Sequence, residues 1–512
     1  MPLDRFSRRM LLKAGIAAGG MTRMAFPQGD FIRGKTTTSS LALAGILNSI
    51  RYASLPPTPV KYAKMILAST LSSAAAGANV GSVRIIRELA KEQGGKGEAT
   101  VWFDGAKLPV ASTARVNAML SDASASDDSD LRNVAHIGTC LTAVGLAVGE
   151  RMNASGYETL SAMIAGYEAA GRITDAIAAS SPSAGGGGGA GAVSGSVGRG
   201  FHASAIVAFG GAVAASKLLR LTDEQMAQAI GITATTVGGL SIGTNSWARE
   251  YHAGNAALTS INAALAASRG YTVNPDMLEA PGGFLAVFTG GTPDALSLAR
   301  QLKPAPDVIG PAQIAPNGDY QIARYLAVKL VPGAHALHPA VEAAVNAARE
   351  SGARPEDVAQ ILVAGPQSGL VAAAPPKDFI QAIHSLSYYI ASAVADKDFS
   401  WVHAEPAMIE RPVIGRLIGL VAQDPAPSPV RYQWPWGATV TIVTRSGARF
   451  RSTVDAPKGS APRGIEWSDI EAKYRALMPQ SKLPADRISE ILRTIRNFEQ
   501  VKSVSELTGL LS

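Results

Sequence analysis

Cysteine is almost absent from this chain of 512 residues, in which Cys140 is the single example. A lone cysteine excludes a disulfide within the chain. It also excludes an iron–sulfur cluster held by cysteines of this chain. Any reaction that needs a Lewis acid of that kind is therefore outside what the sequence predicts.

Aromatic residues and long apolar runs are also scarce. Aromatic residues make up 6% of the chain, whereas hydrophobic residues make up 47% and glycine occurs 52 times. This composition is typical of closely packed helices rather than a β-sandwich. No run approaches the roughly 20 apolar residues of a membrane span. The net charge is +7, but Lys and Arg are dispersed and form no basic stripe. We therefore expect no nucleic-acid partner. We do expect a weak attraction for acidic small molecules.

The N-terminus carries an export pattern. Ser7-Arg8-Arg9-Met10-Leu11-Leu12-Lys13 is followed by a short Ala/Gly stretch, which is typical of a twin-arginine signal. We therefore expect the twin-arginine export machinery as a partner and a periplasmic or secreted location. Arg23 interrupts the small residues before Ala25, so the cleavage position stays open, as does a retained N-terminal anchor.

The periodicity of apolar residues predicts two folded parts. Helical spacing recurs from Thr38 to about residue 269, with a glycine-rich stretch near 183–195. After about Pro304, short β-branched runs alternate with helices, and the last two predict a hairpin that turns at Ser446-Gly447. The expected fold is mostly α, with a signal segment at 1–30, a large all-helical domain at 31–289, a smaller α+β lid domain at 290–455, and helices at 456–512 that return to the helical domain.

Four of the seven histidines directly precede predicted apolar helices: His136, His202, His252 and His338. A helix N-terminus offers unpaired N–H groups and a partial positive charge, so it attracts carboxylates. The same field keeps a nearby histidine neutral and able to accept a proton. Four such ends around one cavity would bind a polyanion and supply a base. The alternative is four separate capping or packing histidines.

An acidic segment comes shortly before the first of these histidines. Asp127, Asp128 and Ser129 lie on the predicted loop that leads to His136. Adjacent carboxylates can orient a histidine, hold a proton or bind a metal ion, and an Asp/Ser helix cap is the alternative interpretation. Because the loop lacks a dense set of further ligands, no metal site is expected.

Taken in order, these residues resemble the MmgE/PrpD family, the 2-methylcitrate dehydratase family that also includes cis-aconitate decarboxylase and an iminodisuccinate epimerase. The resemblance runs from about Thr38 to near the C-terminus. It implies a helical domain and a smaller α+β lid with the active site between them, a homodimer, and no metal or organic cofactor. The segments that carry it are Asp127-Asp128-Ser129 with His136, Gly200-Phe201-His202, Arg249-Glu250-Tyr251-His252 with Gly254, Lys329 and His338 with Pro332 between them, and Ser385-Leu386-Ser387-Tyr388.

The chain departs from the family pattern at several of these places. Ala125 stands where the family often has an aspartate, Ser129 replaces a threonine, and one extra residue precedes His136. Arg249 replaces the lysine of the Lys-x-x-His segment. An arginine clamps a carboxylate but does not act as a proton donor or base. A weakened or altered enzyme is therefore one reading of the sequence.

The working hypothesis is a cofactor-free lyase that performs acid–base β-elimination, a dehydration, on a small di- or tricarboxylate. The expected catalytic residues are His136, His202, His252, Asp127, Asp128 and Ser129. Arg249, Lys329, His338 and Tyr388 are expected to bind the substrate. Decarboxylation and epimerisation need the same stabilisation of developing charge, so both remain alternatives. A catalytically silent periplasmic protein that binds carboxylates is a further alternative, which Ala125 favours.

Overall fold

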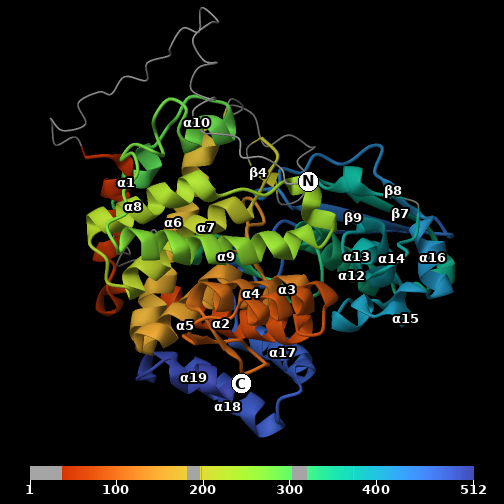
Figure 1. Cartoon of the computed structure of the whole chain (residues 1–512). Coiled ribbons are helices and arrows are strands. Elements are labelled where there is room, and N and C mark those ends of the chain that lie inside the picture. Colours follow the sequence, from red (N-terminus) through yellow and green to blue (C-terminus); the bar gives the residue numbers. More distant parts are fainter. Residues whose placement is uncertain (1–36, 182–195, 198, 303–319, 373) are drawn as a thin grey trace, which may run out of the picture. The chain divides into compact units, whose positions relative to one another are not determined.

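A computed structural model describes residues 37–181, 196–197, 199–302, 320–372 and 374–512 (Figure 1). The signal segment and most of the glycine-rich stretch lie outside these residues. Residues 38–512 form one compact unit. The unit is mostly helical, with a large helical part and a smaller part that contains a mixed sheet, as the sequence predicts. Within the described residues, no helix combines the length and the hydropathy that crossing a membrane requires.

The first hydrophobic core is built mainly from the helices of the first 290 residues. These helices are α1 (Ser39–Ser49), α2 (Pro57–Gly77), α3 (Gly81–Gln93), α4 (Val110–Ala123), α5 (Ile137–Met152), α6 (Gly156–Ser180), α7 (Ser204–Leu218), α8 (Asp223–Thr236), α9 (Ala248–Ala267) and α10 (Phe284–Thr289). All but α10 lie within the segment from Thr38 to about residue 269 in which the sequence predicts helical spacing, whereas α10 was not predicted.

Small residues bring these helices unusually close together. A Cβ atom on Gly166 of α6 would lie 2.6 Å from the carbonyl oxygen of Gly210 on α7, and a Cβ atom on Gly210 would lie 2.7 Å from the carbonyl oxygen of Gly166. Glycine allows this approach because it has no side chain. Alanines fill much of the surrounding core. The Ala/Gly-rich composition is therefore used for close helix packing.

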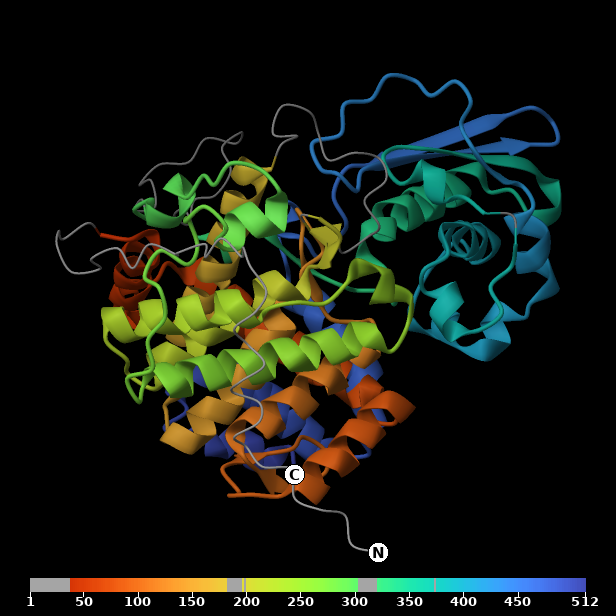
Figure 2. The same cartoon turned by 45° about the horizontal axis from the view of Figure 1, so that its top comes forward.

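The C-terminal helices pack on the first core, although they follow the second part in the chain. They are α17 (Trp467–Leu477), α18 (Ala485–Arg496) and α19 (Ser505–Leu510). Helices α17 and α18 contact α2, and α19 contacts α5 (Figures 1 and 2). A Cβ atom on Gly156 would lie 1.6 Å from the carbonyl oxygen of Phe498, so the tail is closely fitted to the start of α6.

The second hydrophobic core begins at Leu337 and packs helices against one side of a four-stranded sheet (Figure 2). The strand order is β10-β9-β7-β8, with β8 parallel to β7 and the other pairs antiparallel. The predicted hairpin is confirmed, with Gly447 in its turn at φ +86°. The elements are α12 (His338–Ser351), β7 (Val358–Ala364), α13 (Phe379–Ala382), α14 (Leu386–Asp396), α15 (Pro406–Ile409), α16 (Pro412–Ile418), β8 (Val421–Gln423), β9 (Ala438–Thr444) and β10 (Arg449–Val454).

Two short strands connect the parts of the chain that carry the candidate site. Strand β3 (Asp128–Asp130) pairs antiparallel with β6 (Leu326–Val328), which follows α11 (Gln321–Tyr325). Leu326 and Val328 belong to the first core, whereas the sequence places them in the lid domain. The remaining short elements near the site are β4 (Ser196–Val197), β5 (Phe201–His202), η2 (Ser241–Asn245), η4 (His335–Leu337) and η7 (Trp401–Ala404).

Candidate active site

Asp127 is a fully buried carboxylate at the centre of the candidate site. Pairing of β3 with β6 brings it to Lys329, whose Nζ donates to Oδ1 of Asp127 at 2.9 Å. The hydroxyl of Thr139 donates to Oδ2 at 3.0 Å. Burial alone would raise the pKa of Asp127, but His136 and Lys329 outweigh it and hold this pKa well below its ordinary value. Asp127 is therefore an anion near neutral pH.

His136 lies against this anion at the start of α5. Its Nδ1 is 2.5 Å from Oδ2 of Asp127 and 3.8 Å from Oδ1 of Asp122. An ionised carboxylate only accepts hydrogen bonds, so the Nδ1 proton faces Asp127. Nε2 is then the ring atom with a lone pair in the neutral imidazole.

Asp128 caps α5 and does not face the cavity. Its carboxylate accepts from the backbone N–H groups of Gly138 at 2.8 Å and Thr139 at 3.2 Å. This end of α5 is therefore occupied by the protein's own carboxylate, and the expected role of the helix start in binding an acidic substrate does not apply here. Burial and the neighbouring charge of Asp127 raise the pKa of Asp128 to about 6.

Arg249 forms a second buried ion pair, with Asp122 at the end of α4. Its Nε donates to Oδ2 of Asp122 at 3.0 Å, and Nη2 donates to the backbone oxygen of Asp122 at 2.8 Å. Nη1 has no hydrogen bond to a described residue. The guanidinium therefore keeps a donor group for a ligand in the cavity, while Asp122 fixes its position.

His202 and His252 form a pair of rings whose centroids are 5.0 Å apart. The N–H of Ser204 donates to Nδ1 of His202 at 3.2 Å, so the neutral ring carries its proton on Nε2. Burial, with smaller contributions from His252, His136 and Arg249, lowers the pKa of His202 to about 3. His202 is therefore neutral at physiological pH and offers a donor rather than a strong base.

His252 does not occupy a helix start, contrary to the sequence-based expectation, because α9 already begins at Ala248. Its ring lines a separate small cavity, which also includes Ser204 and Asn255. Burial lowers its pKa, although the nearby carboxylate of Asp122 acts in the opposite direction. His252 therefore packs beside His202, outside the main cavity.

A second histidine pair comes from the segment that enters α12. The rings of His335 and His338 are 4.6 Å apart, and both residues are buried. His335 lines the main cavity and His338 does not. Burial is the largest cause that lowers both pKa values, to about 3 for His338, and the charge of Lys329 acts in the same direction. Both rings are neutral near pH 7.

These groups surround one cavity between the helical part and the second core. Four histidines line it, together with both buried cations. Its volume is about 30 Å³, which is room for about two water molecules. The lining residues are Ala125, Val134, His136, His202, Thr244, Arg249, Lys329, Gly333, Ala334, His335 and His384.

Besides Asp127, Asp128 and His252, three further residues that the sequence assigns to the site lie outside this cavity. Ser129 is buried in β3. The Tyr388 hydroxyl donates to the backbone oxygen of His403 at 2.6 Å, so it stabilises the second core. His338 lies behind His335. The structure thus brings His136, His202, Arg249 and Lys329 together at the cavity, with Asp127 directly behind them.

Three residues outside the motifs recognised in the sequence complete the site. Asp122 orients Arg249, and His335 and His384 line the cavity. Nδ1 of His384 donates to the backbone oxygen of Ile380 at 2.9 Å, and burial lowers its pKa to about 4. The spacing His335-Ala-Leu-His338 was an available signal for His335. His384 directly precedes the Ser385–Tyr388 segment that the family resemblance included.

Asp122, Asp127 and His136 also form the one group of possible metal ligands within the described residues, with ligand atoms within 4.8 Å of one another. Arg249 and Lys329 already neutralise the two carboxylates. A divalent cation at this position would repel both cations. Because Arg249 and Lys329 stand beside these carboxylates, the site suits an organic acid better than a metal ion.

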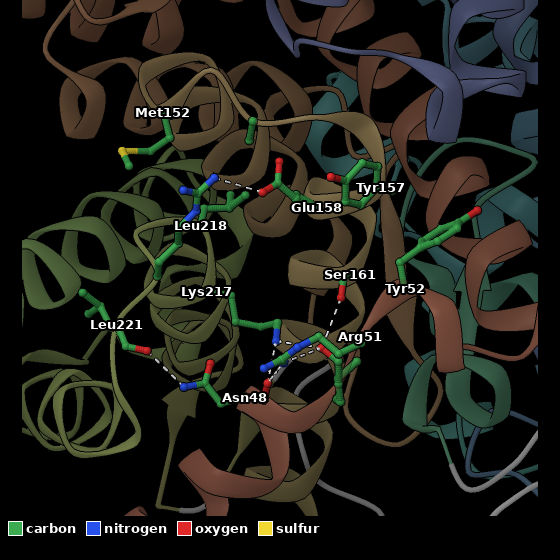
Figure 3. A pocket seen from close by; sticks show the side chains of 13 residues that line it. Asn48, Arg51, Tyr52, Met152, Tyr157, Glu158, Ser161, Lys217, Leu218 and Leu221 are labelled. Atoms are coloured by element: carbon green, nitrogen blue, oxygen red, sulfur yellow. Dashed lines mark hydrogen bonds and ion pairs between the residues drawn. The ribbon is translucent and has the colours of Figure 1, made fainter.

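A larger pocket, of about 360 Å³, lies between α1, α6 and α7 (Figure 3). It contains no histidine. Lys217 points into this region, but its Nζ donates to the backbone oxygens of Leu47, Asn48 and Ile50 at the end of α1. This pocket is larger than the histidine-lined cavity, but the acid–base groups favour the histidine-lined cavity as the candidate site.

Comparison with known proteins assigns both parts of the chain. The family model of the MmgE/PrpD N-terminal domain matches residues 41–296, and that of the MmgE/PrpD C-terminal domain matches residues 332–497. Cis-aconitate decarboxylase of Homo sapiens is 23% identical over 487 residues, which cover 93% of this chain and 95% of that protein. Cis-aconitate decarboxylase of Mus musculus is 22% identical over 489 residues, with 93% of each chain covered.

The buried neutral histidines predict that acid destabilises the fold. His338 has a folded pKa of about 3 against an ordinary value of 6.5, so below pH 6.5 the unfolded chain binds a proton that the folded chain rejects. Stability should fall as the pH drops through this window, by up to about 1.4 kcal/mol per pH unit for one such group. We expect His338→Gln to make this fall shallower in urea unfolding between pH 7 and pH 5. An unchanged slope would contradict the assignment.

Proposed function

The chain belongs to the MmgE/PrpD family, whose enzymes are lyases that act on carboxylic acids, and on this premise we propose that it dehydrates a small di- or tricarboxylate by acid–base catalysis. The observation that carries the proposal is the Asp127–His136 pair, which faces a cavity lined by neutral histidines and two buried cations. The reaction breaks a C–H bond next to a carboxylate and a C–O bond at the neighbouring carbon.

His136 is the proposed base. Asp127 holds its Nδ1 proton, which directs the lone pair of Nε2 toward the substrate and stabilises the imidazolium that forms when the α-proton is taken. The electron pair of the broken C–H bond forms the new double bond. Lys329 stays paired with Asp127 during this step, so the buried anion remains compensated.

His202 is the proposed donor to the leaving group. Its neutral ring carries a proton on Nε2, which can donate a hydrogen bond to the departing oxygen. The hydroxide receives the proton that His136 took from carbon, which gives water and regenerates the base. Arg249 Nη1 and the remaining N–H of Lys329 are placed to bind carboxylates and the negative charge that develops on them. Because the cavity has room for about two waters, the surrounding side chains must move apart when a polycarboxylate enters.

Decarboxylation of an unsaturated acid is the second candidate. It is favoured by the two cis-aconitate decarboxylases to which the chain is similar over nearly its full length. That reaction breaks a C–C bond, releases carbon dioxide and ends with protonation of carbon. The protonated form of His136 would then supply the proton. The same cations would stabilise the intermediate charge.

A ligand screen should first identify a di- or tricarboxylate that raises the Tm of the protein. We expect the protein to turn over that compound. Proton NMR in deuterated water distinguishes the reactions: dehydration gives an alkene with all carbons retained, whereas decarboxylation loses one carbon and incorporates deuterium.

His136→Asn should lower kcat/KM by about 10²- to 10⁴-fold, the usual contribution of a general base.

His403→Asn is the matched control, because His403 is also buried but pairs with Asp396 in the second core, at 3.0 Å. It should retain turnover. Full activity of folded His136→Asn would refute the assignment. A carboxylate that binds without turnover and without deuterium exchange would instead identify a catalytically silent binding protein.

We further propose export by the twin-arginine route, on the strength of Arg8 and Arg9 in the first segment. A fusion of residues 1–36 to a folded reporter should reach the bacterial periplasm, and replacement of both arginines by lysine should retain it in the cytoplasm. Arg23→Lys is the control and should have no effect. Export of the double variant would contradict the proposal.

A homodimer is the proposed assembly, supported by an exposed apolar surface on the helical part. Leu240, Ile242, Trp247 and Tyr251 are 59%, 85%, 52% and 45% exposed. The indole of Trp247 also lies against Gly81 at the start of α3. Large apolar side chains that gather on a surface are typical of a protein interface. A second copy of the chain is the occupant that the family resemblance implies.

Light scattering should therefore report a dimer for the native chain and a monomer for Ile242→Glu, because a buried, unpaired carboxylate opposes association. We expect the dissociation constant to rise at least about tenfold, or 1.4 kcal/mol. Val402→Glu, on a similarly exposed residue of the second core (49%), should stay dimeric. A monomeric native chain would exclude this assembly.

A further inference from the structure

Lys473 is a buried cation from the C-terminal tail that the proposed reaction does not use. It lies on α17 and is 1% exposed. Its Nζ donates to the hydroxyl of Ser69 on α2 at 2.7 Å and to the backbone oxygen of Ser126 in a shorter contact. Ser126 directly precedes Asp127, so the ammonium group holds the backbone of the acidic segment against the helical core.

The same ammonium group lies where the two cores meet. Nζ is 5.7 Å from the ring centre of Trp401, which belongs to η7 in the second part. Charged and titratable groups face it from several elements: Asp127 and Asp128 from the acidic segment, Lys329 from the end of β6, and His335 and His338 from the entry to α12. The other charged residues of α17 point elsewhere, since Asp469 pairs with Lys458 and Arg475 with Glu471.

Burial of the Lys473 ammonium group lowers the stability of the fold, because the charged form loses its contact with water. Burial, partly offset by Asp127, lowers the pKa of Lys473 to about 7. An apolar side chain of similar length would fill the same space without that cost. A titratable amine therefore occupies this buried position at a cost in stability, directly behind the carboxylate on which the proposed base depends.

We propose that Lys473 is a positioning residue of the active site: its ammonium group, fixed by Ser69, holds the backbone of Ser126 so that the carboxylate of Asp127 faces His136 and Lys329. This inference rests on the proposed function for its catalytic consequence. The positional part rests on the hydrogen bonds alone. It also assigns the C-terminal helix, more than 300 residues away in the chain, a part in the site.

Two variants of adjacent residues on α17 test the proposal. Lys473→Met removes the ammonium group at nearly constant length. Tyr474→Phe is the matched control, because it removes one hydrogen bond of an equally buried side chain, to the backbone oxygen of Ile488 at 2.9 Å, away from the site. We expect Lys473→Met to lower kcat at least tenfold with little change in KM, and Tyr474→Phe to keep the native kcat. Lys473→Gln, which keeps a donor but no charge, separates hydrogen bonding from charge.

The pH dependence of kcat is a measurement that would not change if the role of Lys473 were purely structural. Loss of a nearby cation favours protonation of the coupled Asp127–His136 pair, so the acid limb of the kcat profile should move to higher pH in Lys473→Met and stay in place in Tyr474→Phe. Equal losses of kcat in both variants, in proportion to their losses of Tm and with unmoved acid limbs, would overturn the proposal.

A direct measurement keeps this test separate from the proposed function. The His136 Nδ1 proton held against Asp127 should give a downfield proton NMR resonance, assigned by its absence in His136→Asn. It should be lost or displaced in Lys473→Met and retained in Tyr474→Phe. An unchanged resonance in Lys473→Met would refute the positioning role. A displaced resonance in a protein that turns over no carboxylate would leave the positioning role standing and refute only the proposed reaction.

Discussion

The compensation of one buried carboxylate organises the centre of this protein. A carboxylate without access to water is strongly unfavourable unless charged partners and hydrogen-bond donors surround it. Asp127 obtains them from three separate parts of the chain: Lys329 after β6, Thr139 in α5, and His136 before α5. Meeting this requirement fixes the pairing of β3 with β6. It also fixes the entry into α5 and the meeting point of the two cores.

The other side chains of the site follow from the same constraint. Two cations line the cavity beside the carboxylates with which they pair, and each cation disfavours a positive charge on a neighbouring buried histidine. His202 and His335 are therefore neutral near pH 7, through burial first and nearby positive charges second. A neutral imidazole donates from one nitrogen and accepts at the other. The site can thus offer both a proton acceptor and a proton donor at one pH.

The packing of the helical part makes this burial possible. Glycines such as Gly166 and Gly210 let helices approach almost backbone to backbone, and alanines fill the remaining space. The acidic segment can then lie deep in the molecule and still touch α2, α5 and α17. The C-terminal tail completes this arrangement, since Lys473 reaches Ser126 from the far end of the chain.

The sequence by itself determined the fold class, most helix positions, the final hairpin and the family. These depend on local periodicity, turn residues and ordered motifs, which are properties of neighbouring residues. It also selected His136, His202, Arg249 and Lys329 as candidate site residues, and the structure brings these four to one cavity.

Only the tertiary structure decided which residues meet. His335 and His384 reach the cavity, while His252 and His338 lie one ring behind it, and no local pattern distinguishes the two groups. Asp128 caps a helix rather than facing a ligand, and Tyr388 bonds within the second core, although both lie in segments that resemble the family. The physical reason is that burial and charge pairing act between segments hundreds of residues apart, and the sequence records the residues but not those distances.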